Sequence, residues 1–299
     1  MGSHSVLSGH VFAFGSHVML NSPSHPQHRT SMQDPSYKFD APDADVILRA
    51  PLQPGSKELK DFKVHKAILS VASTFFHEMF SVPQLPQPAK NNTTLPVVQI
   101  IEPAGAFEVF LRLIYPIEPP VINSLLLLNG LFGLAVKYTA GGVRAKLRQT
   151  LVSPSFLKSD PIAVYAIACR ANLEEEAKLA ISYTFEIDLI GEFPNSKLQT
   201  MTTEVYHRLL VGHSLRRDQL INAVDEVCGS RGRPLCRCIL YFKMEMRIHI
   251  SVKPFFDRDA LVKCLPSQER NLACPGGCFL TPRGANLFLT DLLRRIREL

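Results

Sequence analysis

The sequence of 299 residues has no apolar run long enough to cross a bilayer. The longest apolar stretch, Leu125 to Val136, spans about twelve residues and contains Asn129, whereas a membrane-spanning helix needs about 20. No Lys or Arg precedes the apolar patch near the start of the chain, as it would in a secretory signal. We therefore expect an intracellular protein, cytoplasmic or nuclear, that does not enter a membrane.

The sequence also lacks the motifs of nucleotide binding and of common hydrolases. Neither G-x-G-x-x-G nor G-x-x-x-x-G-K-[ST] occurs, and there is no HExxH motif or nucleophile elbow. His65, next to Lys66 and downstream of Asp45, could suggest acid–base chemistry. We interpret His65 as structural, capping a helix entry and bonding a neighbouring backbone group. We expect no enzymatic activity and no cofactor.

Positive charge is only slightly in excess of negative charge. The chain has 33 Lys and Arg against 27 Asp and Glu, a net charge of +6. Such a mild charge permits nucleic-acid binding but does not argue for it. The segment Ala285 to Glu298 is amphipathic, with Leu289, Leu292, Leu293 and Ile296 on one face and Arg294, Arg295 and Arg297 on the other. Packing on its own domain is the simpler interpretation, and partner or nucleic-acid binding is the alternative.

The chain has seven cysteines, an odd number, and they do not lie in a short, loop-rich stretch of the kind that carries the disulfide framework of a small secreted domain. A zinc site needs four ligands, in closely spaced pairs, and only Cys274 and Cys278 around Gly-Gly fit this well. Cys236 and Cys238 would point about 200° apart on a helix. We interpret the cysteines as reduced thiols without metal. The alternative is a small zinc knuckle drawn from Cys274, Cys278, Cys236 and Cys264, with His249 as a substitute ligand.

The stretch from Asp43 to Phe80 carries the clearest pattern in the chain. Val46 and Leu48 alternate with polar residues as in a half-buried strand, and so do Phe62 and Val64. After His65 the apolar residues recur at helical spacing: Ile68, Ala72, Phe75, Phe76, Met79 and Phe80. The pattern predicts a strand, a loop, a second strand and one helix that ends near Ser81.

The rest of the chain divides into an irregular start and a mainly helical remainder. Residues 1–37 are rich in Ser, His, Pro and Gln, and we expect a disordered arm there. Leu95 to Ile101 is a short β-branched run and predicts a third, buried strand. Helices are predicted at 104–115, 124–139, 142–151, 161–171, 173–189, 196–211, 214–228, 234–250 and 285–298.

This order of elements, with these residues, resembles the BTB/POZ domain. The resemblance rests on Asp45-Val46, Phe62, His65-Lys66, Leu69, Ser73, Phe75 and Phe80, then on Ala106-Phe107, Leu111, Ile114, Tyr115, Val136-Lys137-Tyr138 and Val143. It implies an α+β fold at 38–155, with a small, mostly three-stranded sheet and helical hairpins. An all-α region at 156–299 follows, and the resemblance fades after about residue 195.

The resemblance also implies a function. BTB/POZ domains are protein–protein interaction modules, so we expect a non-catalytic adaptor or regulator that self-associates, as a dimer, and recruits partners. In dimeric members the positions of Asp45 and Lys66 line a charged pocket at the subunit boundary, which makes Asp45, His65 and Lys66 the predicted partner-binding or dimer site. The alternative function is a nucleic-acid-associated transcriptional regulator with a structural zinc knuckle.

The family includes adaptors that bring substrates to a cullin ubiquitin ligase, and other members act in transcriptional repression. A cullin-type scaffold is therefore a candidate partner. In this chain a Pro-rich insert at 83–96 changes the surface beside the third strand, where a cullin would approach in the family. The resemblance alone does not decide between these roles.

Overall fold

A computed structural model of the chain describes residues 37–82, 95–189, 191, 201–229, 237–265 and 282–299. The predicted disordered arm, except Tyr37, and the candidate zinc ligands Cys236, Cys274 and Cys278 lie outside the described residues. The predicted division of the chain near residue 155 stays a prediction.

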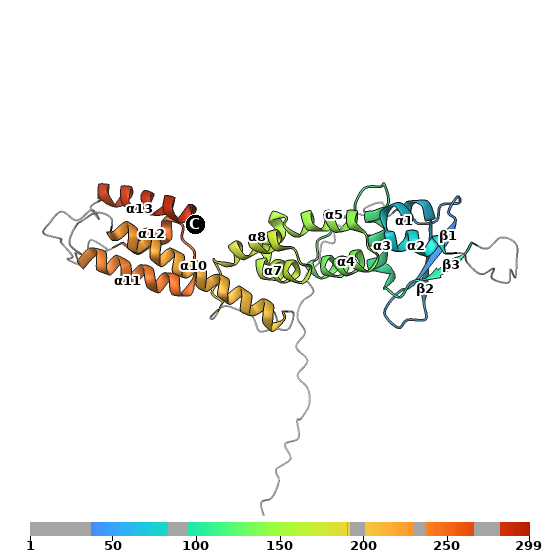
Figure 1. Cartoon of the computed structure of the whole chain (residues 1–299), viewed down its shortest axis with the longest axis horizontal. Helices are drawn as coiled ribbons and strands as arrows, with labels where there is room; N and C mark the ends of the chain where they lie inside the picture. Colours follow the sequence, from blue (N-terminus) through green and yellow to red (C-terminus); the bar gives the residue numbers. More distant parts are fainter. Residues whose placement is uncertain (1–36, 83–94, 190, 192–200, 230–236, 266–281) are drawn as a thin grey trace, which may run out of the picture. The chain divides into compact units, whose positions relative to one another are not determined.

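A three-stranded sheet opens the described chain, with its strands in the order β2-β1-β3 (Figure 1). Strand β1 (Val46–Pro51) pairs antiparallel with β2 (Leu59–Val64), which places Leu48 opposite Phe62. In β1 buried residues alternate with half-buried ones, because successive side chains point to opposite faces of a strand. The two strands predicted from the alternation are confirmed.

The third strand is shorter and more exposed than predicted. Strand β3 (Val97–Gln99) runs parallel to β1, and both Val97 and Gln99 are exposed. Just beyond it, Ile101 is 78% exposed. The predicted third strand within Leu95 to Ile101 is confirmed, but its predicted burial is wrong, because among the described strands β3 lies at the edge of the sheet with a neighbour on one side.

The single helix predicted after His65 is in fact two helices, α1 (Lys66–Ala72) and α2 (Thr74–Ser81). They are separated by Ser73, whose backbone is extended. The Ser73 hydroxyl accepts a hydrogen bond from the N–H of Phe76 at 3.1 Å and donates one to the carbonyl oxygen of Tyr138. The first bond caps α2. Because only Ser73 interrupts the two helices, the apolar spacing that predicted a single helix continues across the break.

Three further helices complete the aromatic core of this part: α3 (Ala104–Ile114), α4 (Leu125–Lys137) and α5 (Gly141–Leu151). Tyr138 follows α4 directly, and its ring stacks on that of Phe76 with centroids 5.1 Å apart. The same ring also contacts Phe107 and Phe110 of α3. Tyr138 thus joins residues from three helices in one buried aromatic cluster.

Three more helices follow: α6 (Pro154–Ser159), α7 (Pro161–Arg170) and α8 (Glu174–Thr184). Helix α6 has no counterpart in the sequence-based prediction. Asn172 separates α7 from α8 with a φ of 52°, a left-handed conformation that Asn tolerates better than most residues. The predicted helix break at Asn172 is confirmed.

Helix α10 (Thr203–Gly229) is one helix of 27 residues rather than the two predicted at 196–211 and 214–228. It continues through Gly212, because one glycine inside a helix costs only about 1 kcal/mol relative to alanine. Gly212 faces Ile181 of α8, and a Cβ atom at this position would lie 2.4 Å from Ile181 Cδ1. The glycine therefore permits close packing between two helices.

The last helices are α11 (Arg237–Val252), α12 (Arg258–Lys263) and α13 (Pro282–Arg297). They share one apolar core with α10, and α12 is a second helix that the sequence pattern missed. The largest members of this core are Leu220, Ile239, Phe242, Met246, Ile250, Phe256, Leu261, Phe288, Leu289, Leu292 and Ile296. The apolar face of α13 thus packs on its own domain, which confirms the simpler interpretation of this segment.

Candidate interaction surfaces

Asp45 and Lys66, predicted to line a charged pocket, are in contact through the backbone of Lys66. The Asp45 carboxylate accepts a hydrogen bond from the Lys66 N–H at 2.8 Å, which caps the first turn of α1 from the strand side. Asp45 is exposed, and the Lys66 ammonium group lies 5.8 Å from the centre of the Phe80 ring. The pair fixes the junction between sheet and helix and leaves the carboxylate open to solvent.

His65 lies at the same junction but does not act as predicted. Its side chain makes no capping bond to α1. Instead its backbone N–H donates to the Tyr115 hydroxyl at 2.9 Å, and its Nδ1 lies 3.2 Å from the same oxygen. Its Nε2 faces Asp43 at 3.4 Å. The structural interpretation of His65 holds, but its partners are side chains rather than a neighbouring backbone group.

A second polar cluster, which the sequence reasoning missed, lies around Tyr138. Its hydroxyl donates to the Glu102 carboxylate at 2.7 Å, and Lys137 forms an ion pair with the same carboxylate. Burial raises the pKa of Glu102, but the hydrogen bonds from Lys137 and Tyr138 outweigh it and leave the pKa below its usual value. Burial and the Glu102 charge raise the pKa of Tyr138, so both partners keep their ordinary charge states at neutral pH.

Several large apolar side chains of this first part are exposed to solvent. Val71 on α1 is 91% exposed, Phe75 on α2 is 39% exposed, and Val136 near the end of α4 is 66% exposed. Phe75 contacts the edge of the Tyr138 ring at 5.3 Å between centroids, so it belongs partly to the core. Singly exposed apolar side chains are ordinary on protein surfaces, and only a contiguous patch marks a binding site, so these three side chains do not by themselves mark one.

The small mixed sheet and the helices around Tyr138 correspond to a known family. Residues 52–153 match the family model of the BTB/POZ domain. This part of the chain is a BTB/POZ domain. Such domains are, in general, protein–protein interaction modules and are typically not enzymes. The resemblance on which the fold prediction rested is thus confirmed, and so is the α+β domain followed by helices.

No curated protein matches the chain. The helices in the described part of the chain are too short or too polar to pass through a membrane.

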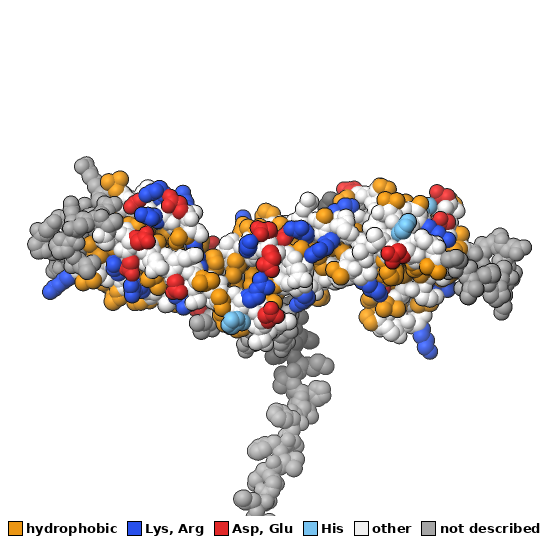
Figure 2. Space-filling view, in the orientation of Figure 1, with side chains coloured by type: hydrophobic (Ala, Val, Ile, Leu, Met, Phe, Trp, Pro, Cys, Tyr) orange, Lys and Arg blue, Asp and Glu red, His pale blue; other side chains and the backbone are white. Residues whose placement is uncertain are grey.

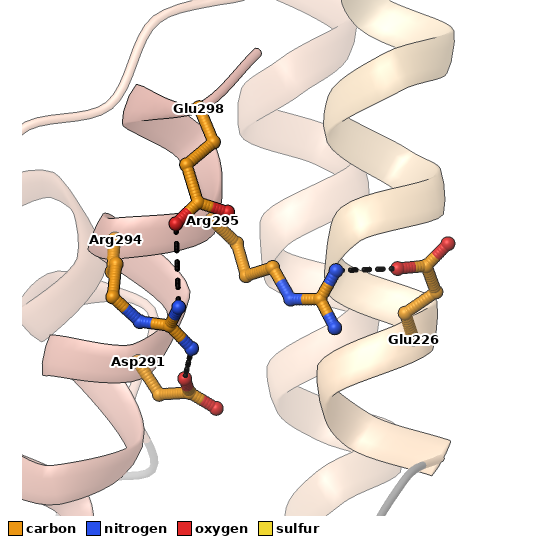
Figure 3. Close-up of polar contacts among 5 residues, drawn as sticks. All are labelled: Glu226, Asp291, Arg294, Arg295 and Glu298. Carbon is orange, nitrogen blue, oxygen red and sulfur yellow. Dashed lines mark hydrogen bonds and ion pairs between the residues drawn. The ribbon is translucent and has the colours of Figure 1, made fainter.

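The arginines of α13 lie on the segment for which partner or nucleic-acid binding was the alternative interpretation. Figure 3 shows that two of them already have acidic partners. Arg294 contacts Asp291 at 2.8 Å and Glu298 at 3.3 Å, and Arg295 contacts Glu226 of α10 at 3.4 Å. The Asp291 and Glu298 carboxylates raise the pKa of Arg294. Arg295 thus links α13 to α10, whereas both partners of Arg294 lie within α13 or directly after it.

Charges of both signs are interspersed on the face of the described residues that Figure 2 shows. On the face in Figure 2, Lys and Arg side chains lie close to Asp and Glu side chains along the helices of the described residues. A protein that binds nucleic acid through its backbone usually gathers basic residues on one face. The pattern on this face does not show such a concentration among the described side chains.

Of the four candidate zinc ligands, Cys264 alone is among the described residues. It ends α12 and is buried in the apolar core shared by the last helices. Burial raises the pKa of the Cys264 thiol, which disfavours the thiolate that zinc requires. His249, the substitute ligand, stacks on Phe256 with ring centroids 5.0 Å apart. Within the described ranges, no group of three His, Cys, Asp or Glu side chains is placed to hold a metal ion.

Proposed function

We propose that the chain is a non-catalytic adaptor or regulator that self-associates through its BTB/POZ domain and recruits other proteins inside the cell. The observation that carries the proposal is the family match over residues 52–153.

Within this proposal, Asp45, His65 and Lys66 lie at the boundary between two subunits of a dimer. The exposed Asp45 carboxylate and the half-buried Lys66 offer charges of both signs close together on one surface. A two-fold dimer contacts the same patch on both subunits, so a patch with both charges can pair with itself. Charges of this kind favour the correct geometry more than they add affinity.

Size-exclusion chromatography with light scattering tests self-association of the full chain. We expect a mass of twice the monomer that falls when Lys66→Glu is introduced. Lys63→Glu is the matched control, because Lys63 is an exposed lysine on the neighbouring strand β2. A monomer at high concentration would overturn self-association, whereas an unchanged dimer in a folded Lys66→Glu variant would overturn only the assignment of the site.

Co-purification of the chain from native cells, followed by mass spectrometry, identifies the class of partner. Recovery of a cullin would support the adaptor role in a ubiquitin ligase, and recovery of transcriptional repressors would support the regulator role. The second candidate function, a nucleic-acid-associated regulator, is tested by binding to duplex DNA at several salt concentrations. Affinity that falls steeply with salt would support it.

A further inference from the structure

Helix α11 has two apolar faces, although only one of them meets the core of the described region. Ile239, Phe242, Met246 and Ile250 are buried against the neighbouring helices. On the opposite side Leu240, Met244, Ile248 and Val252 are 51%, 51%, 57% and 46% exposed. They follow one another at intervals of four residues, so they form one continuous row, the outer row, along the helix. Lys243 and Arg247 lie between the two faces on one side and Glu245 on the other, so α11 is apolar on two opposite faces rather than all round.

Helix α13 shows that the outer row is unusual for this bundle. The apolar residues Phe288, Leu289, Leu292 and Ile296 of α13 are all buried. Its opposite face carries the arginines that contact acidic residues in Figure 3. Helix α13 therefore has the pattern of a surface helix with one side in water, whereas α11 does not.

An open groove of about 610 Å³ runs beside the outer row. Leu240, Met244 and Ile248 line it together with Ser251 of α11 and Asp225 of α10. An enclosed cavity of this volume would suit a small molecule. Because this groove is open along a row of side chains, it is better suited to a helix that inserts one side chain at each turn.

The groove carries a positive flank. Lys243 and Arg247 both contact Asp225, at 2.9 Å and 3.0 Å, so two cations share one carboxylate. Burial raises the pKa of Asp225, but the hydrogen bonds and positive charges of Lys243 and Arg247 have the larger combined effect and leave the pKa below its usual value. Asp225 is therefore ionised at neutral pH. The flank is left with one net positive charge, and Arg247 is 57% exposed along its side chain.

We propose that the groove beside the outer row of α11 binds an amphipathic helix of a partner protein, with apolar residues at each turn and acidic residues along one flank. The proposal rests on the recruiting role proposed above and assigns it a surface outside the BTB/POZ domain. A second copy of α11 fits less well. In an antiparallel pair with two-fold symmetry the flanks of the same kind meet, which would place Arg247 of one copy near Arg247 of the other.

A displayed library of 18-residue helix-forming peptides, selected against the full chain, tests this proposal. We expect enriched peptides to have apolar residues at helical spacing and Glu or Asp on one flank. Binding of a synthesised winner should weaken about tenfold or more in Ile248→Glu, because a charge replaces a central apolar contact. Leu215→Glu on α10 is the matched control, since Leu215 is 59% exposed, and it should leave binding unchanged. Arg247→Gln should weaken binding and reduce its dependence on salt.

Each remaining outcome overturns the proposal. One is that no enriched peptide depends on Ile248, and another is that the winners lack acidic residues. Crosslinks from Met244→p-benzoylphenylalanine to residues 1–36 would show that the chain covers its own groove. A dimer that dissociates in Ile248→Glu but not in Lys66→Glu would make a second copy the occupant. Light scattering on the same variants shows whether self-association through the BTB/POZ domain survives when the groove assignment fails.

Discussion

His213 Nε2 lies 2.9 Å from the hydroxyl oxygen of Thr184, and both residues are buried. The Thr184 hydroxyl donates to the carbonyl oxygen of Ile181, so its oxygen accepts from His213, which places the proton of the neutral imidazole on Nε2. The contact joins α10 to the end of α8, and Phe185 packs against the His213 ring. Burial, with a smaller effect of Arg217, lowers the pKa of His213 to about 4.

Stability should therefore fall at mildly acidic pH. His213 has a folded pKa of about 4, below the ordinary value of 6.5, so the unfolded chain binds the proton first as pH falls. The contribution of the neutral imidazole is complete above about pH 6.5 and is lost towards pH 4, on the order of 3 kcal/mol in all. Urea unfolding of the full chain between pH 7.5 and 4.5 measures this loss.

His207 on the same helix is exposed and provides the control. His213→Gln should flatten the dependence of unfolding free energy on pH between 6.5 and 4.5, whereas His207→Gln should leave the slope as it is. An equal slope in wild type and His213→Gln would show that His213 is not the group responsible.

Substitution of Gly212 should distinguish a small side chain from a branched one. Gly212→Ala gains about 1 kcal/mol of helix propensity, which offsets the contact with the terminal methyl of Ile181, so we expect little net change. Gly212→Val adds volume that this methyl cannot avoid, and it should cost about 2 kcal/mol. Thermal unfolding of the double variant with Ile181→Ala should recover part of that loss. Strictly additive effects would contradict direct packing between the two positions.

Ser73→Ala should destabilise the BTB/POZ domain more than the removal of a single hydroxyl group usually does. The variant loses both the cap on α2 and the bond to the Tyr138 carbonyl, which together should cost about 2 kcal/mol. Ser70→Ala, in the neighbouring helix α1, is the control and should change stability by less than about 0.5 kcal/mol. Equal denaturation midpoints for the two variants would refute the dual role of Ser73.

Asp45→Ala should lower stability by about 1 kcal/mol, because the first turn of α1 loses its cap. Asp43→Ala removes a neighbouring carboxylate that is 79% exposed and should change stability much less. Chemical denaturation of both variants measures the difference. If Asp45 served association alone, Asp45→Ala would alter the mass measured by light scattering and leave the unfolding free energy of the monomer unchanged.

The sequence predicted the elements whose periodicity is strong and failed where a single residue sets the structure. Alternation at Val46 and Leu48 indicated β1 correctly. The break at Ser73 was invisible because the apolar spacing continues across it, although serine before a helix is a recognised capping signal. The error at 211–214 runs in the opposite direction, since the predicted gap between two helices lies inside α10, where Gly212 provides room for Ile181.

The assignment of Asp45, His65 and Lys66 as a partner-binding or dimer site stays a prediction, and the structure shows only which contacts these residues make within the chain. Asp45, His65 and Lys66 do meet at one junction, as their place in the family pattern implied. Their partners could not be predicted, because Tyr115 and Phe80 approach from helices that only the tertiary fold brings near. Glu102 was missed because its environment comes from Lys137 and Tyr138, more than 30 residues away. The outer row of α11 escaped because apolar spacing does not show which face is covered.

The mixed sheet also sets an order of assembly. Leu48 pairs with Phe62, 14 residues along the chain, and with Val98, 50 residues along. Closing the longer loop costs more entropy, by about 1 kcal/mol, and the three-residue β3 gives few bonds in return. The β1–β2 hairpin should thus form first during folding, with β3 added once α3 has packed. In pulsed hydrogen exchange, the Leu52 amide, which donates to the Glu58 carbonyl oxygen across the hairpin, would then gain protection before the Ile100 amide, which donates to the Arg49 carbonyl oxygen.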